Sequence, residues 1–186
     1  MACLSNYSLK GLLADCAPVL PGISEVWIGY HQDYAVTINE SAHSVSSITA
    51  SSGAKMEHYE FQRQTGSLTS TGTRSEANNS TYFTNTIALQ FSKLEGVKHM
   101  EIEALSKERL AVIVHTTDGK YFYVGAAGDE TNAYVTGSDV TAATGQSMDD
   151  FNGYNISLSN VSGHLPYEMT AAQVASVTAA SAQVAQ

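Results

Sequence analysis

One long polar segment between two strand patterns restricts the fold of this chain more than any other feature. Residues Gln62 to Ser80 have the sequence QRQTGSLTSTGTRSEANNS, with Leu68 as the one large apolar residue after Thr65. A strand pattern with a period of two follows it, from Phe83 to Phe91, and a shorter one precedes it at Tyr59 to Phe61. The segment therefore predicts an extended hairpin whose polar arm, residues 62–80, leaves the domain.

The arm is interpreted as a contact for a neighbouring subunit. Its Ser, Thr and Gly residues cannot offset the entropy of ordering without a partner surface. The residues predicted to make this inter-subunit contact are Thr65, Gly66, Ser67, Leu68, Thr69, Ser70, Thr71 and Arg74.

Alternating patterns elsewhere predict further strands. Residues 26–30 and 34–38 alternate on both sides of the polar residues His31 to Asp33, which predicts a first hairpin. The Ser-rich residues 41–52 are expected to connect this hairpin to the arm. Two more strands are expected later in the chain, at residues 134–140 and 154–161.

The clearest hairpin signal lies between two short apolar runs, residues 110–114 and 121–124. They are joined across Asp118-Gly119, a dipeptide that tolerates the positive φ angles of a tight type I′ turn. This turn is expected to be structural, without a functional role.

One segment has a helical period instead. Residues 97–108 predict an amphipathic helix of about three turns, with Lys98, Glu101 and Glu108 facing outward. The apolar face that should pack on a sheet consists of Val97, Met100, Ala104 and Leu105.

The two ends of the chain have little regular pattern. A short helical piece is expected at residues 9–14, followed by a turn-rich lead-in, DCAPVLPGI, at residues 15–23. Residues 170–186 carry no charge, so we expect them to pack on their own domain or on a neighbouring subunit.

Length, charge and cysteine usage limit the classes of protein. The 186 residues, 43% of them hydrophobic, suffice for one domain. The net charge of -9 argues against a surface that grips nucleic-acid phosphates, although it could repel DNA. Cys3 and Cys16 are expected to be buried free thiols. The first 23 residues contain no signal-peptide core or membrane span, which predicts an intracellular origin and no membrane contact.

No catalytic, cofactor or metal site is predicted. The entry motifs of serine hydrolases, nucleotide hydrolases and dinucleotide-binding proteins are missing. The six histidines are scattered over turns and strand edges, and His99 with Glu103 has no third ligand nearby. Asp149 and Asp150 are interpreted as a loop before a strand. We therefore expect a protein that is not an enzyme.

The order of elements resembles the tail tube family of bacteriophages and related injection machines. Three pieces carry the resemblance: DCAPVLPGISEVWI at residues 15–28, TNTIALQFSKLEGVKHMEIEAL at residues 84–105, and NGYNISLSNVSGHLPYEM at residues 152–169. The last piece is similar to the terminal strand of tube proteins from phages of gut bacteria.

This resemblance implies a mainly β fold, a β-sandwich or barrel-like pair of sheets with one flanking α-helix and a long extended hairpin arm. It implies one tail-tube-like domain over residues 1–169, with residues 170–186 as a C-terminal extension. In the family, subunits join edge to edge in rings, commonly hexameric, and a long hairpin or loop contacts the next ring. The same fold also serves in connectors between portal and tail.

Two functions follow as hypotheses. The first is a virion structural protein, made in the host bacterial cytoplasm, whose rings form a conduit in a tail or connector. Other virion proteins would be its partners, and double-stranded DNA would pass an acidic lining without specific binding. The second is a phage head decoration or fibre-type β-sandwich module, in which the arm would be a binding loop.

Overall fold

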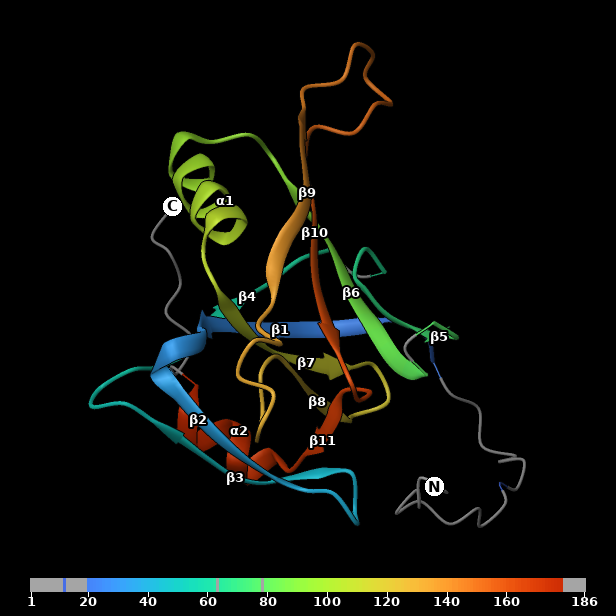
Figure 1. Ribbon diagram of the computed structural model, residues 1–186. Helices are drawn as coiled ribbons and strands as arrows, with labels where there is room; N and C mark the ends of the chain where they lie inside the picture. Colours follow the sequence, from blue (N-terminus) through green and yellow to red (C-terminus); the bar gives the residue numbers. More distant parts are fainter. Residues whose placement is uncertain (1–11, 13–19, 63, 78, 179–186) are drawn as a thin grey trace.

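The computed structural model describes residues 12, 20–62, 64–77 and 79–178. Within these residues the fold is mainly β, with two sheets and two helices, which confirms the predicted pair of sheets with a flanking helix. The strands of the smaller sheet run across those of the larger sheet (Figure 1). Cys3, Cys16, most of the predicted helix at residues 9–14 and residues 179–186 lie outside the described residues.

The larger sheet has seven strands in the order β2-β3-β11-β8-β7-β1-β4. Neighbouring strands are antiparallel except β3 and β11, which are parallel. In chain order the strands are β1 (Ile23–Tyr30), β2 (Tyr34–Asn39), β3 (Ser44–Ala50), β4 (Glu57–Tyr59), β7 (Leu110–Thr116), β8 (Tyr121–Val124) and β11 (Tyr167–Met169).

The smaller sheet has four antiparallel strands in the order β5-β6-β10-β9. Two of these strands, β9 (Thr136–Ala143) and β10 (Gly153–Ser162), confirm the strands predicted at residues 134–140 and 154–161. In chain order the strands are β5 (Ser67–Ser75), β6 (Ser80–Ser92), β9 (Thr136–Ala143) and β10 (Gly153–Ser162).

Two apolar clusters lie on opposite faces of the larger sheet. The first fills the space between the sheets and includes Val112 and Val114 of β7 with Ile87 of β6. The second lies on the far face and includes Ile113 of β7 with Tyr123 of β8. Residues 110–114 are therefore all buried, since alternate side chains of β7 enter different clusters.

Two helices cover the sheets at different places. The helix α1 (Gly96–Lys107) packs on the first cluster, and α2 (Ala171–Val177) packs on the second. The start of α2 is fixed by a capping box, in which Thr170 Oγ1 accepts from Gln173 N and Gln173 Oε1 accepts from Thr170 N. The helix α2 was not predicted, and its Val174 and Val177 are buried.

The predicted first hairpin is wrong, because β1 and β2 do not pair. The short 3-10 turn η1 (His31–Asp33) redirects the chain, and His31 N donates to Arg109 O at 2.9 Å. The strand β1 then pairs with β4 and β7, while β2 pairs with β3. The strand β3 lies in the Ser-rich segment for which the sequence predicts a connection. A Cβ on Gly29 would lie 2.6 Å from the Tyr34 ring, so a glycine in β1 makes room for the start of β2.

The hairpin across Asp118-Gly119 is confirmed, but its turn differs from the predicted type I′. Only Gly119 in this turn has a positive φ, of 86°. Gly119 N donates to Thr116 O at 3.0 Å, and Thr116 N donates to Lys120 O at 2.8 Å. This is the longer hairpin connection in which a turn is followed by a left-handed residue, and it needs glycine at one position only.

Candidate assembly surfaces

The smaller sheet ends in two strands whose second edges are unpaired in the described part of the chain. These edge strands are β5, with nine residues, and β9, with eight. Each presents a row of backbone N–H and C=O groups that a further strand could pair with. Neither β5 nor β9 contains proline or lysine, the residues that commonly protect edges.

The outer face of this sheet is polar and nearly uncharged. In β6 and β10 buried and less buried residues alternate, and the register between strands places the less buried ones on one face. Asp139 is the only charged side chain there among the described residues. The face consists of Ser67, Thr69, Thr71 and Thr73 of β5, Tyr82, Thr84, Thr86, Ala88 and Gln90 of β6, Asn155, Ser157, Ser159 and Val161 of β10, and Thr136, Asp139 and Thr141 of β9.

The edge strand β9 is held from the opposite face by α1. Gly137 lies so close to the helix that a Cβ would be 2.6 Å from Ser106 Cα. A register shift follows at Ser138, whose Oγ donates to Ser157 O at 3.0 Å. The bulge interrupts the regular pairing of β9 with β10 at this point, and α1 packs against the same segment.

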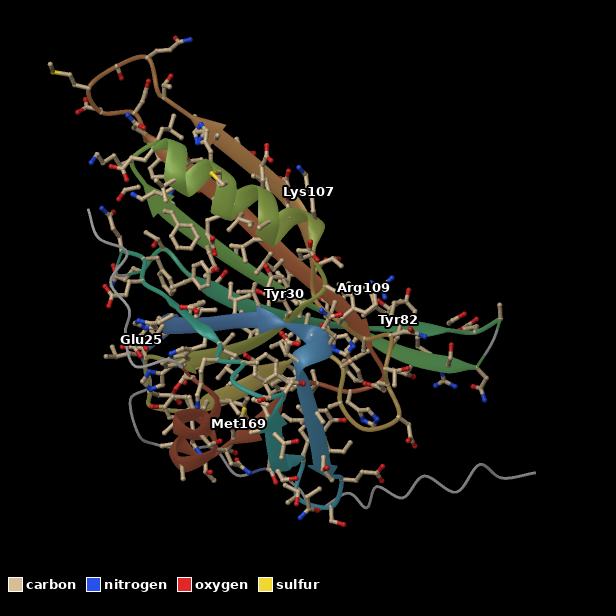
Figure 2. The ribbon with its side chains drawn as sticks, turned by 90° about the vertical axis from the view of Figure 1, so that its left-hand side faces the viewer. Glu25, Tyr30, Tyr82, Lys107, Arg109 and Met169 are labelled. Atoms are coloured by element: carbon tan, nitrogen blue, oxygen red, sulfur yellow. The ribbon has the colours of Figure 1, made fainter. Side chains whose placement is uncertain are left out.

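The hairpin of β5 and β6 projects beyond the body of the protein (Figure 2). Its last registered pair is Ser75 with Ser80, and Arg74 pairs with Thr81 one step earlier. Arg74 Nη2 donates to Asn79 Oδ1 at 3.2 Å. The tip thus carries two charged residues of opposite sign, Arg74 near the end of β5 and Glu76 in the turn.

The structure corrects the predicted arm in two respects. The strand before the arm, at residues 57–59, is β4 and pairs with β1 of the larger sheet, so it is not the partner of β6. The partner is β5 itself, which turns residues 67–75 of the arm into a regular strand. The chain crosses between the sheets at Gly66, which is buried. A Cβ at this position would lie 2.6 Å from side-chain atoms of both Ile23 and Phe61, so the crossing requires glycine.

The predicted arm residues therefore divide into two groups. Thr65 and Gly66 lie at the crossing, and Thr65 Oγ1 donates to Gln62 O. The rest lie along the edge strand, with Arg74 near the tip, and they are Ser67, Leu68, Thr69, Ser70, Thr71 and Arg74.

The predicted apolar face of the helix is wrong in part. Val97 and Met100 are 67% and 77% exposed, and Ala104 is half-buried. Leu105 is buried as predicted, together with Ile102, which was not included. The helix has two apolar stripes, and the pattern alone does not say which of them meets the sheet.

Two tyrosines, one from each sheet, form hydrogen bonds with α1 that fix its rotation about the helix axis. Tyr59 of β4 donates to Glu101 Oε1, and the hydroxyl of Tyr154 of β10 bonds to His99 Nδ1. Burial, and then the hydrogen bond to Glu101, raise the pKa of Tyr59. Glu101 therefore has a partner, although it was expected to face outward freely.

Two histidines that are distant in sequence meet around a carboxylate at one end of the larger sheet. Glu25 Oε2 lies 3.7 Å from His115 Nδ1 and 3.9 Å from His58 Nε2. Trp27 stacks on the His58 ring, with 5.2 Å between the ring centroids. We call Glu25, His58 and His115 the Glu25 cluster. The sequence did not indicate it, because the strand order that unites β1, β4 and β7 is not visible in the pattern.

The other candidates for chemistry have structural contacts. His99 bonds to Tyr154, as described above, and Glu103 pairs with Lys107 at 3.1 Å. Asp150 Oδ2 accepts from the backbone N of Gln146 and Ser147, at 2.8 Å each, and these bonds lower the pKa of its carboxyl group. Among the described residues no group of three or more His, Cys, Asp or Glu side chains could hold a metal ion.

Comparisons with known proteins add no relative. No protein-family model matches the chain, and neither the curated proteins nor the solved structures include a significant match. Among the described residues, no helix is long and apolar enough to cross a membrane. The functional argument therefore depends on the surfaces of the chain itself.

Proposed function

We propose that this chain is a virion structural protein whose rings form a conduit for double-stranded DNA in a phage tail or portal-tail connector. The observation that carries the proposal is the smaller sheet, which combines two edges unpaired in the described part of the chain with a nearly uncharged outer face. The proposal also agrees with the family resemblance of the sequence.

The two edges support a contact between copies of the chain. They lie on opposite sides of one sheet and have nearly equal lengths, so β5 of one copy can pair with β9 of the next. Because the contact joins two different surfaces, it repeats around an axis and closes into a ring when the rotation allows. A hexamer is the number that the family resemblance implies.

The outer face of the sheet would line the ring. Its described side chains include no lysine or arginine, so they offer DNA phosphates no cation to bind. It holds a single carboxylate, Asp139, instead of the acidic lining expected from the net charge. Free passage of DNA would therefore depend more on hydroxyl and amide groups than on repulsion.

The projecting hairpin would extend toward the next ring or toward another virion protein. A two-stranded ribbon is marginally stable alone, so its tip gains most from a surface that covers it. The closed ring and the projecting tip together would give a stacked tube or a connector.

Cysteine cross-linking tests the edge contact directly. Cys3→Ser and Cys16→Ser form the background, and Thr141→Cys is combined with Ser67→Cys, Thr69→Cys or Thr71→Cys. Oxidation should give a ladder of covalent oligomers for at least one combination, because paired strands bring Cα atoms within disulfide reach. The matched control replaces Thr141→Cys by Thr37→Cys on β2, which should give no ladder.

Mass photometry separates the two functions. Rings predict one large species at a fixed multiple of the chain mass. Monomers or trimers without any edge cross-link would contradict the ring and favour a head decoration or fibre-type binding module.

A further inference from the structure

Two apolar side chains are exposed where the smaller sheet ends at β9. Met100 of α1 is 77% exposed, and Val140 of β9 is 38% exposed. Val140 pairs with Ile156, which is buried in the first cluster, so Val140 belongs to the inner face of the sheet. It is exposed because no strand in the described part of the chain lies beyond β9.

The helix α1 runs along β9 on this inner face (Figure 2). Near the start of the helix, His99 Nδ1 bonds to the hydroxyl of Tyr154, whose register partner in β9 is Ala142. Near its end, the backbone of Ser106 lies against Gly137 of β9. The start of α1 is therefore level with the end of β9.

The contact of a nearby lysine fixes the direction in which Met100 points. Lys98 Nζ donates to Ser92 O of β6 at 3.0 Å, so Lys98 extends from α1 toward an inner strand of the sheet. Met100 follows Lys98 by two residues, which is a rotation of about 200° around the helix axis. Met100 therefore points to the opposite side of the helix, toward the free edge of β9 and on the same face as Val140.

The proposed ring places β5 of the next copy beside this edge. The four strands of the smaller sheet are antiparallel to their neighbours, so its two outer strands, β5 and β9, run in opposite directions. Copies related by rotation about the ring axis keep this direction, so β5 of the next copy pairs with β9 in the antiparallel sense. When the two strands pair along their lengths, the start of β5 lies beside the end of β9.

The start of β5 carries an apolar side chain on the matching face. Leu68 is the second residue of β5, and it pairs with Ile87, which is buried in the first cluster. Leu68 therefore belongs to the inner face, and it is half-buried in the isolated copy. It is the only large apolar residue of β5.

We propose that Leu68 of one copy packs on Met100 and Val140 of the next copy, beneath the pairing of β5 with β9. This inference rests on the proposed ring and adds an apolar layer on the inner face to the contact between strand edges. The layer removes apolar surface from water, which favours association, and it selects the antiparallel register that brings Leu68 to Met100.

Two methionine variants of the full-length chain test the contribution of this layer to assembly. Met100→Gln should weaken association about tenfold or more, because it places an amide where an apolar side chain would be buried. The matched control is Met148→Gln, since Met148 lies in the loop between β9 and β10 and is also fully exposed. It should leave ring assembly unchanged. Sedimentation velocity over a range of concentrations measures association, and denaturant melts of the monomer should show no loss for either variant.

Cross-linking tests which residues meet. In the Cys3→Ser and Cys16→Ser background, Leu68→Cys combined with Met100→Cys should give covalent oligomers with a short bifunctional thiol reagent. Leu68→Cys combined with Met148→Cys should give none.

The outcomes separate this contact from the ring itself. Weaker assembly of Met100→Gln together with the cross-link between positions 68 and 100 supports the contact. Wild-type assembly by Met100→Gln overturns it and leaves the ring in place, which the cross-links of Thr141→Cys report independently. The absence of the 68–100 cross-link, where the Thr141→Cys ladder forms, also overturns it. Lower monomer stability of Met100→Gln would show that the chain's own residues cover this side chain, which again overturns the contact. A wild-type chain that never associates contradicts both proposals.

Discussion

The two sheets differ in how many of their faces are covered. The larger sheet has an apolar cluster on each face, and its inner strand β7 contains five consecutive buried residues. The smaller sheet has one covered face, so buried and exposed residues alternate in β6 and β10. A sheet with both faces covered keeps only its edges for partners, whereas a sheet covered on one side also keeps a face. The larger sheet therefore supplies most of the core, and the smaller sheet supplies the exposed face and the long edges β5 and β9 of the proposed ring.

The difference between the two sheets is tested most strongly by truncating one side chain in each of them. Ile113→Ala in β7 removes a fully buried side chain and should lower the free energy of unfolding by about 2 to 5 kcal/mol. Thr86→Ala, on the outer face of the smaller sheet, should stay within about 0.5 kcal/mol. Denaturant melts under conditions that keep the subunit monomeric measure both. Equal losses would mean that the two sheets do not differ as described.

A second pair of variants tests the orientation of α1, which covers part of the inner face of the smaller sheet. Leu105→Ala should destabilise by about 2 to 5 kcal/mol, because Leu105 is 3% exposed. Met100→Ala, from the exposed stripe, should change stability by about 0.5 kcal/mol or less. The same melts apply, and a larger loss for Met100→Ala would reverse the assignment of the two stripes.

A smaller effect is expected at the turn between β7 and β8 of the larger sheet. Gly119→Val should cost about 1 to 3 kcal/mol, because a β-branched residue resists a φ of 86°. A Cβ there would meet no atom within 4 Å, so the loss comes from the backbone alone. The variant should assemble less only to the extent that less of it is folded. A folded Gly119→Val that cannot assemble would show that this turn is itself a contact.

The smallest predicted effect is a pH dependence at His31, which links β1 and β2. Burial and the nearby Arg109 lower its pKa from the ordinary value of 6.5. The unfolded chain then binds the proton more readily than the folded chain as pH falls below about 6.5. Stability should be complete above that pH and decline toward the lowered folded pKa.

Unfolding free energies measured between pH 7.5 and 5 check this expectation. His31→Gln should lose less stability across this range than the wild type, because the remaining histidines are shared by both. Parallel curves for the two chains would show that His31 does not titrate differently on folding.

Local patterns in the sequence predicted part of the fold. The alternation of β6 and β10, the apolar runs of β7 and β8, and the presence of α1 all depend on neighbours in sequence, which a pattern records. The sequence does not predict β3, because its residues, SVSSITA, are rich in serine and have a low β propensity. Pairing with β2 stabilises the strand nevertheless. For α2, the spacing of Thr170 and Gln173 matches a capping box, so the sequence does contain a signal for the start of this helix.

The assembly surfaces could be predicted only in outline. The polar segment indicated a projecting hairpin, and Arg74 was included among its contact residues. The strand order of the two sheets determines which strands are edges. It also determines that Glu25 lies near His58 and His115. That order is set by long-range packing, such as the room that Gly29 leaves for Tyr34, and a single sequence contains no direct record of it.

Negative-stain electron microscopy of the purified wild-type chain tests the central claim most directly. The account predicts closed rings with a central opening, single or stacked, over a range of protein concentrations, because two complementary edges of one sheet repeat around an axis. Isolated subunits or compact trimers without an opening, at concentrations where the chain is fully folded, would contradict it.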